Sequence, residues 1–180
     1  MISVATSLKH RLPTTIRTQR LLLVTPAMVH APAIAQLCNN INVHKWMARL
    51  PFPYGLSDAE FFITEIVPSA AEICFAITLD DALIGVVGLA LSDDHAPELG
   101  YWLGEPYWGH GYASEAAAAV LEAARAAGTR ELRSRARKDN AGSRNVLRKL
   151  GFAEVGENIE TEGFLAGQTM VRMLRELEPR

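Results

Sequence analysis

Cysteine is scarce in this 180-residue chain, which contains only Cys38 and Cys74 and no C-x-x-C spacing. This scarcity argues against a disulfide framework and against a zinc ribbon, and it predicts that both thiols are buried, reduced packing residues. The five histidines are scattered, with no H-E-x-x-H pair and no grouping with the cysteines. We therefore predict no metal site.

Long apolar runs are also missing, since no segment is long and apolar enough to span a bilayer. The first residues have neither the apolar centre nor the cleavage pattern of a secretory signal. These absences predict a cytoplasmic protein with no membrane partner. We expect residues 1–13 to form a flexible leader and residues 14–180 a single domain, because a chain of this length suits one well-packed core.

Charge of one sign is not in excess, because the formal net charge is -2 and 21% of the residues are charged. With 49% hydrophobic residues, the composition is typical of a globular protein. Net charge alone therefore indicates no particular partner.

The apolar pattern predicts strands and helices around one mixed sheet, an α/β (α+β) fold. Strands are expected over residues 18–24, 73–79, 83–91, 98–104, 131–137, 152–156 and 168–174, and helices over 27–39, 57–67, 112–127 and 141–150. Asp80-Asp81 predicts a hairpin turn, Ser57 and Glu60 have the spacing of a capping box, and Gly128 is expected to end a helix. Residues 43–55 hold three aromatics and two prolines, and this irregular stretch either walls a pocket or covers the core.

The stretch from Glu98 to Glu115 contains a predicted strand, a loop with Gly109 and Gly111, and the start of an alanine-rich helix. Two closely spaced glycines let a ligand approach the backbone, and the first amides of a helix have no intrahelical partner. This geometry favours an anion, so a phosphate-bearing ligand is the first hypothesis. The alternative is that the glycines are ordinary turn residues.

Neither of two nucleotide-binding motifs fits this stretch. Gly109-x-Gly111-x-x-Ser114, with Glu131 about twenty residues further on, approaches the dinucleotide fingerprint. However, Ser114 replaces a small apolar residue, and the chain lacks the repeated βαβ units of that fold. A phosphate-binding loop of the Walker type is excluded because His110-Gly111-Tyr112 stands where Gly-Lys-Ser/Thr is required.

Four motifs in order resemble the GNAT superfamily of acyl-CoA N-acyltransferases, specifically its ribosomal-protein alanine N-acetyltransferase-like (RimJ/RimL-like) branch. They are Thr18-Gln-Arg20-Leu21-Leu-Leu23, Gly100-Tyr101-Trp102-Leu103, Trp108-Gly-His-Gly-Tyr-Ala-Ser-Glu-Ala116, and the series from Asn140 through Ser143, Leu147 and Gly151 to Phe152. The chain departs from the superfamily's Arg/Gln-x-x-Gly-x-Gly/Ala signature at Pro106, which replaces the first position.

The resemblance implies a GNAT-type fold, a central mostly antiparallel sheet with a splayed parallel pair, flanked by helices. Acetyl-CoA is the implied cosubstrate, with its pantetheine arm between the splayed strands and its pyrophosphate on the amides of the glycine loop. The implied contact residues are Tyr101, Trp102, Leu103, Trp108, Gly109, His110, Gly111, Tyr112, Ala113, Asn140 and Ser143.

Acetyl transfer from a thioester requires an uncharged amine and a stabilised leaving thiolate. Glu98, just before the splayed strand, is the candidate general base, acting through a water; the alternative is a solvent-facing strand residue. Ser143 resembles the family serine near the coenzyme sulfur, where it can donate to the thiolate; a bare serine here more often caps a helix. Both residues are the predicted catalytic groups.

Eight of the eighteen Lys and Arg residues lie between residues 130 and 149. One or two of them are expected to meet the 3′-phosphate of the coenzyme, and the others to form a solvated face. Nucleic acid is not an expected partner, because the net charge is acidic and no aromatics interleave with the cluster.

The sequence therefore predicts transfer of an acetyl group from acetyl-CoA to a primary amine by direct attack in a ternary complex. The acceptor is a protein N-terminus or a small-molecule amine, because fold and coenzyme site do not select between them. Neither cysteine lies in a motif suited to a nucleophile. A non-catalytic acyl-CoA-binding module for sensing or assembly is the alternative. Exposed sheet edges are compatible with a monomer or a homodimer.

Overall fold

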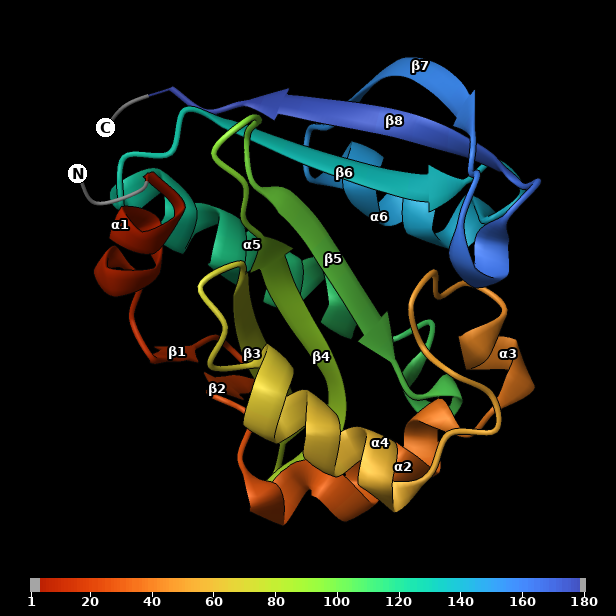
Figure 1. The fold of residues 1–180 in the computed structure, drawn as a ribbon. Helices are drawn as coiled ribbons and strands as arrows, with labels where there is room; N and C mark the ends of the chain where they lie inside the picture. Colours follow the sequence, from red (N-terminus) through yellow and green to blue (C-terminus); the bar gives the residue numbers. More distant parts are fainter. Residues whose placement is uncertain (1–3, 179–180) are drawn as a thin grey trace.

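Residues 4–178 are described by the structure, a computed structural model, and they form a twisted sheet with helices on both faces (Figure 1). Within these residues the sheet has eight strands in the order β1-β2-β3-β4-β5-β6-β8-β7. The strands are β1 (Thr15–Arg17), β2 (Leu22–Val24), β3 (Glu72–Leu79), β4 (Ala82–Ala90), β5 (Glu98–Leu103), β6 (Glu131–Arg137), β7 (Ala153–Ile159) and β8 (Thr169–Glu176).

Helices α5 (Tyr112–Ala126) and α6 (Ala141–Lys149) lie behind the sheet in Figure 1, and α2 (Ala31–Cys38) and α4 (Leu56–Phe61) lie in front of it. The other helical segments are α1 (Val4–Arg11), α3 (Ile41–His44), η1 (Met28–His30), the π-helical turn η2 (Phe62–Ile66), η3 (Glu105–Tyr107) and η4 (Gly163–Leu165). In the part of the chain that the structure describes, no helix is long and apolar enough to cross a membrane.

The strands β5 and β6 separate soon after they meet, which confirms the mostly antiparallel sheet with a splayed parallel pair. Their ladder contains one pair of partners, Glu98 and Arg133, and the Arg133 amide donates to the Pro97 carbonyl over 2.9 Å. Beyond this pair, the hydroxyl of Ser134 donates to the Leu99 carbonyl over 2.9 Å in place of a backbone donor. The splay begins at this side-chain bridge.

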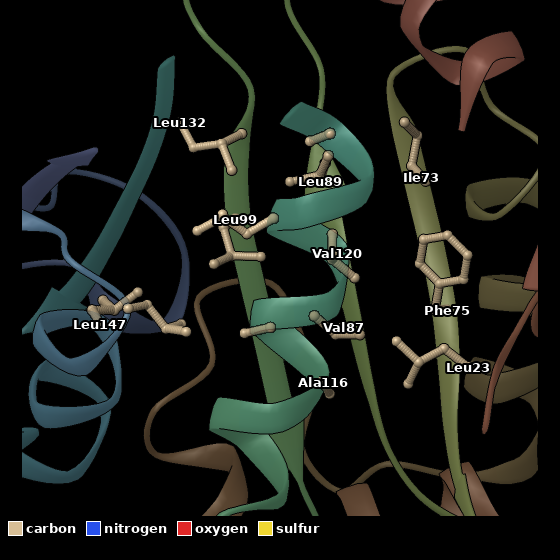
Figure 2. Close-up of a cluster of buried hydrophobic side chains, with 14 of the residues drawn as sticks. Leu23, Ile73, Phe75, Val87, Leu89, Leu99, Ala116, Val120, Leu132 and Leu147 are labelled. Carbon is tan, nitrogen blue, oxygen red and sulfur yellow. The ribbon is translucent and has the colours of Figure 1, made fainter. Parts of the chain in front are cut away.

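The larger core cluster fills the space between the sheet and α5 (Figure 2). Leu23, Phe75, Leu89 and Leu99 point toward α5 from four strands, and all four are buried. The α5 face that meets them contains small residues, so the helix packs close to the sheet. A second cluster packs α2 and α4 on the opposite face, where it includes Trp102 of β5.

Several predicted elements are confirmed with shifted bounds. The hairpin of β3 and β4 turns through Asp80 and Asp81, whose φ angles of 47° and 65° suit a primed turn. Gly128, with φ 88°, follows the end of α5 as expected. Of the strand predicted over residues 18–24 only β2 is a strand, and β1 lies just before that range; the irregular stretch from residue 43 overlaps α3.

The predicted capping box of Ser57 and Glu60 is wrong. Helix α4 begins one residue earlier than expected, with Gly55 as its N-cap residue. The carboxylate of Asp58, at the third helical position, accepts the Gly55 amide over 2.8 Å. Asp58 therefore performs the reciprocal half of a capping box, because a glycine N-cap has no side chain to offer.

Helix α1 lies in the segment expected to be a flexible leader. Leu8 and Leu12 are buried in the larger core cluster, and the ammonium of Lys9 donates to the carbonyls of Val67 and Ser69. The described part of this segment is thus a helix packed on the domain, and the i, i+4 spacing of the two leucines is the signal for it.

Candidate active site

The loop between β5 and α5 presents backbone amides at the start of a long helix. Gly109 and Gly111 have φ angles of 79° and 81°, a region that side chains disfavour, and Gly111 is the N-cap residue of α5. Among the described residues, no protein acceptor receives the amides of residues 109–114. These amides lie at the positive end of a fifteen-residue helix, an arrangement that is suited to bind an anion.

Trp108 fixes one side of this loop. Its indole nitrogen donates to the Leu103 carbonyl over 2.8 Å, which joins the loop to the last residue of β5. His110 stacks on Tyr112 with ring centroids 5.6 Å apart. The contacts keep the predicted loop residues together at the open end of the splay.

Arg20 and Glu115 fix the other side of the loop. The Glu115 carboxylate accepts the Thr18 hydroxyl over 2.6 Å and the Arg20 amide and Nε over 2.8 and 2.7 Å. Arg20 also donates to the His110 carbonyl over 3.0 Å and lies 4.5 Å from the centre of the Tyr112 ring. Burial acts to raise the pKa of Glu115, but the hydrogen bonds from Thr18 and Arg20 outweigh it and lower that pKa. The result is an ionised carboxylate whose charge Arg20 offsets beside the anion site.

The backbone of β5 directs alternate residues into the splay. The Gly104 amide donates to Ile84 of β4, whereas the carbonyls of Pro97 and Leu99 accept donors from β6. Since backbone groups alternate along a strand in this regular ladder, those of Tyr101 and Leu103 face the gap and those of Trp102 face β4. Tyr101 therefore presents its backbone amide and carbonyl to the gap, and Leu103 presents its amide, because the Leu103 carbonyl already accepts the Trp108 indole.

Tyr101 and Ser143 meet across the gap. The phenol of Tyr101 lies 3.0 Å from the Ser143 hydroxyl and donates to the Ser143 carbonyl over 3.2 Å. Burial raises the pKa of the phenol to about 12, although its hydrogen bond with Ser143 acts in the opposite direction. The phenol therefore stays protonated and can act as a donor. Ser143 is not the cap of α6, because the Asn140 side chain accepts the Ser143 amide over 3.0 Å and fills that role.

Glu98 lies at the closed end of the splay and is part of an ion-pair chain. Its carboxylate is 3.0 Å from Nε of Arg135, and another nitrogen of Arg135 is 2.5 Å from the carboxylate of Glu160. The side chain of Glu98 is 33% exposed, so water reaches it. The predicted base is thus held by a guanidinium on the sheet face opposite α5.

The irregular stretch near residue 46 contacts β6 and η4. The ring of Trp46 is flanked by Lys45 and by Arg137 of β6, each 5.0 Å from its centre. The ring centroid of His44 lies 4.9 Å from that of Phe52 and 5.0 Å from that of Phe164, and the second contact joins this stretch to η4. The expectation that this stretch covers the core holds for Tyr54, which is buried in the second cluster, whereas a pocket wall stays a prediction.

Most of the basic residues between positions 130 and 149 have acidic partners. Arg144 and Arg148 both bind Glu154, at 2.8 and 2.6 Å, and Lys138 binds Glu157 at 2.9 Å. These surface pairs contribute little to stability. They agree with the expectation of a mainly solvated face.

The two thiols are unsuited to nucleophilic attack. Burial raises the pKa of Cys38 and of Cys74 to about 12, so both are neutral at ordinary pH. Cys38 is buried as predicted, whereas Cys74 retains some exposure. The described residues contain no group of three or more His, Cys, Asp and Glu side chains that could hold a metal ion.

The predicted site residues thus fall into three groups. Those from Trp108 to Ala113 form the anion loop; Tyr101, Leu103, Asn140 and Ser143 surround the gap; and Glu98 lies at its closed end. Trp102 is separate, because its side chain packs under α2 and α4. The sequence did not predict the contact of the Tyr101 phenol with Ser143, nor the ion pairs of Arg20 with Glu115 and of Arg135 with Glu98. For Tyr101, the alternation of β5 was an available signal, since it shares a face with Leu99.

Comparison with known proteins agrees with this geometry. Residues 20–153 match the family described as acetyltransferase (GNAT) domain. The chain therefore belongs to the GNAT acetyltransferase family, as its motifs predicted, and it is an acyl-CoA-dependent N-acetyltransferase.

Solved structures share the fold at low sequence identity. RimL, the ribosomal L7/L12 α-N-protein acetyltransferase, in complex with CoA, has a TM-score of 0.81 and 20% identity, covering 94% of this chain and 99% of that one. RimJ of Mycobacterium smegmatis, with CoA disulfide, has a TM-score of 0.82 and 20% identity, covering 91% and 88%. The microcin C7 self-immunity acetyltransferase MccE, with acetyl-CoA and AMP, has a TM-score of 0.81 and 22% identity, covering 93% and 98%.

Proposed function

We propose that residues 14–180 form a single domain that transfers the acetyl group of acetyl-CoA to a primary amine. The contact between Tyr101 and Ser143 across the splay carries this proposal, because it places two hydroxyl donors where a thioester would lie between β5 and β6. The relatives solved with CoA or acetyl-CoA support the same cosubstrate. The acceptor is a protein N-terminus or a small-molecule amine.

The coenzyme would lie along the loop and the gap. Its diphosphate would accept the free amides of residues 109–114, and Arg20 keeps the Glu115 carboxylate from opposing that charge. Its thioester carbonyl would accept an amide from Tyr101 or Leu103. Backbone amides suffice for the diphosphate, so the absence of a signature side chain at Pro106 is tolerated.

The reaction joins the amine nitrogen to the thioester carbon and breaks the bond from that carbon to sulfur. The nitrogen loses a proton to Glu98 through a water, and the departing thiolate receives one from the hydroxyl of Ser143, which Tyr101 orients and resupplies. Solvent then returns a proton to Tyr101 and removes the one held by Glu98. The products are the acetylated amine and CoA with a free thiol. Because both substrates react directly, no acyl-enzyme forms, in agreement with the neutral thiols.

The test is a screen for thiol release from acetyl-CoA with small amines and N-terminal peptides as acceptors. We expect release with at least one amine and none when the amine is omitted. CoA binding without release for any acceptor would contradict acetyl transfer and favour the sensing or assembly module. Gel filtration at several concentrations distinguishes a monomer from a homodimer.

Variants separate catalysis from binding. We expect Ser143→Ala and Glu98→Ala each to lower kcat by about a hundredfold with little change in the Kd for CoA, since general acid or base catalysis contributes on that order. Ser114→Ala, in α5, serves as the control, because the chemistry assigns no role to its hydroxyl. Equal losses of kcat and CoA affinity in Ser143→Ala would instead indicate a binding role.

A further inference from the structure

A cavity of about 400 Å³ lies on the sheet face opposite α5, beside the closed end of the splay. Its charged lining residues are Glu98, Arg133, Arg135 and Arg172, and Val155 and Asn158 of β7 also contribute to it. The volume suits a small-molecule substrate. Since Glu98 is the proposed base, the cavity opens at the place where an amine would be deprotonated.

The register of β6 and β8 sets two of these arginines against each other. Arg135 and Arg172 are direct partners in the antiparallel ladder, so their side chains leave the same face. Like charges directly opposite destabilise a sheet. Glu98 and Glu160 offset the charge of Arg135, but among the side chains that the structure describes no carboxylate pairs with Arg172.

The neighbouring strand provides room for Arg172. Gly156 of β7 is its ladder partner, at an irregularity of the β7 pairing, and has a φ of 154°. A Cβ at Gly156 would lie 2.8 Å from a terminal nitrogen of Arg172. The guanidinium therefore rests over the glycine while it lines the cavity, and an added methyl group would displace it.

We propose that this cavity binds the anionic group, a carboxylate or a phosphate, of a small amine acceptor. Arg172 holds the anion with its planar pair of N–H donors, Arg133 adds positive charge, and the amine points to Glu98. The anion supplies the counter-charge that Arg172 lacks and relieves its repulsion with Arg135. This inference rests on the proposed function and specifies its acceptor.

Matched acceptors and matched variants test the proposal. The pairs are alanine against alaninamide, and phosphoethanolamine against ethanolamine, so that each pair differs in the anion. Arg172→Gln is compared with Arg175→Gln, because Arg175 is on the same strand, faces the other side of the sheet and lies against Gly151 as Arg172 lies against Gly156.

We expect kcat/KM for at least one anionic acceptor to exceed that of its neutral partner by tenfold or more. Arg172→Gln should reduce this preference to less than twofold, and Arg175→Gln should leave it intact. Gly156→Ala should reduce it in part without a change of charge. Preference for the neutral member of both pairs, or equal behaviour of the two arginine variants, would overturn the inference.

A binding measurement separates this inference from the proposed function. Inorganic phosphate is titrated into the protein saturated with CoA, which occupies the anion loop. We expect Arg172→Gln, but not Arg175→Gln, to weaken phosphate binding about tenfold. Loss of that binding without any acetyl transfer would leave the anion site standing and refute the activity. Acetyl transfer with phosphate binding unchanged in Arg172→Gln would refute the anion site alone.

Discussion

The splay between β5 and β6 divides the sheet into two halves with different surroundings. The half from β2 to β5 is covered by α5 on one face and by α2 and α4 on the other (Figure 1). In the other half, Val171 and Met173 of β8 are buried on the α6 side, while Arg133, Arg135 and Arg172 are exposed on the opposite side. The covered half is therefore packed on both faces, and the open half leaves a charged face exposed.

The largest expected effect is on stability in the covered half. Phe75→Ala should lower the free energy of unfolding by about 3–5 kcal/mol, because it removes a side chain that is 2% exposed from the larger core cluster. Val155→Ala in β7, where valine is 55% exposed, should change it by less than about 0.5 kcal/mol. Urea denaturation measures both. Similar losses of unfolding free energy in the two variants would contradict the distinction between a covered and an open half.

Two buried hydroxyls each bridge strands, one at the boundary between the halves and one within the covered half. Ser134 donates to the Leu99 carbonyl at the splay, and Thr78 donates to the Leu22 carbonyl in the covered half, both over 2.9 Å. Ser134→Ala and Thr78→Val should each lower the free energy of unfolding by about 1–2 kcal/mol, since a buried carbonyl loses its donor.

Function should distinguish these two variants. Only Ser134→Ala should weaken acetyl-CoA binding, by about threefold to tenfold, because its bridge fixes the point at which β5 and β6 separate. Isothermal titration with CoA measures the difference. An unchanged Kd in Ser134→Ala would show that the splay is set by the backbone alone.

Local patterns predicted much of the covered half and the anion loop. The β3–β4 hairpin depends on two apolar runs and the Asp80-Asp81 turn, all within twenty residues. Gly109 and Gly111 are likewise readable in the sequence, since positive φ angles at a helix start require them. The splay and the GNAT family followed from motif resemblance instead, because nothing local to β5 shows that its edge remains open.

The site's side-chain contacts were not predictable, because they join residues distant in the sequence. Tyr101 and Ser143 are 42 positions apart, and Arg20 and Glu115 are 95 apart. Each contact depends on the direction of one strand relative to another element, which hydrophobic periodicity does not encode. The basic run near residue 135 shows the same limit, because its alternation predicted a strand but not which arginines would find carboxylates.

The smallest expected effect concerns Glu115, whose carboxylate accepts hydrogen bonds from Thr18 and Arg20 beside the anion loop. Because its folded-state pKa is lowered, Glu115 adds stability that is fully present above its unfolded pKa of about 4.3 and is lost as the pH falls through the folded value. Glu115→Gln should therefore cost about 1 kcal/mol at pH 7 and nothing at about pH 2.

Denaturation of both proteins at several pH values measures this effect. Glu122→Gln, on the same helix and 47% exposed beside Arg125, is the control and should change stability by less than about 0.5 kcal/mol. A difference in the free energy of unfolding between Glu115→Gln and the parent that stays constant from pH 2 to 7 would show that Glu115 acts through packing and not through its charge. The loop would then hold its shape without Arg20, and Arg20→Gln should leave CoA affinity unchanged.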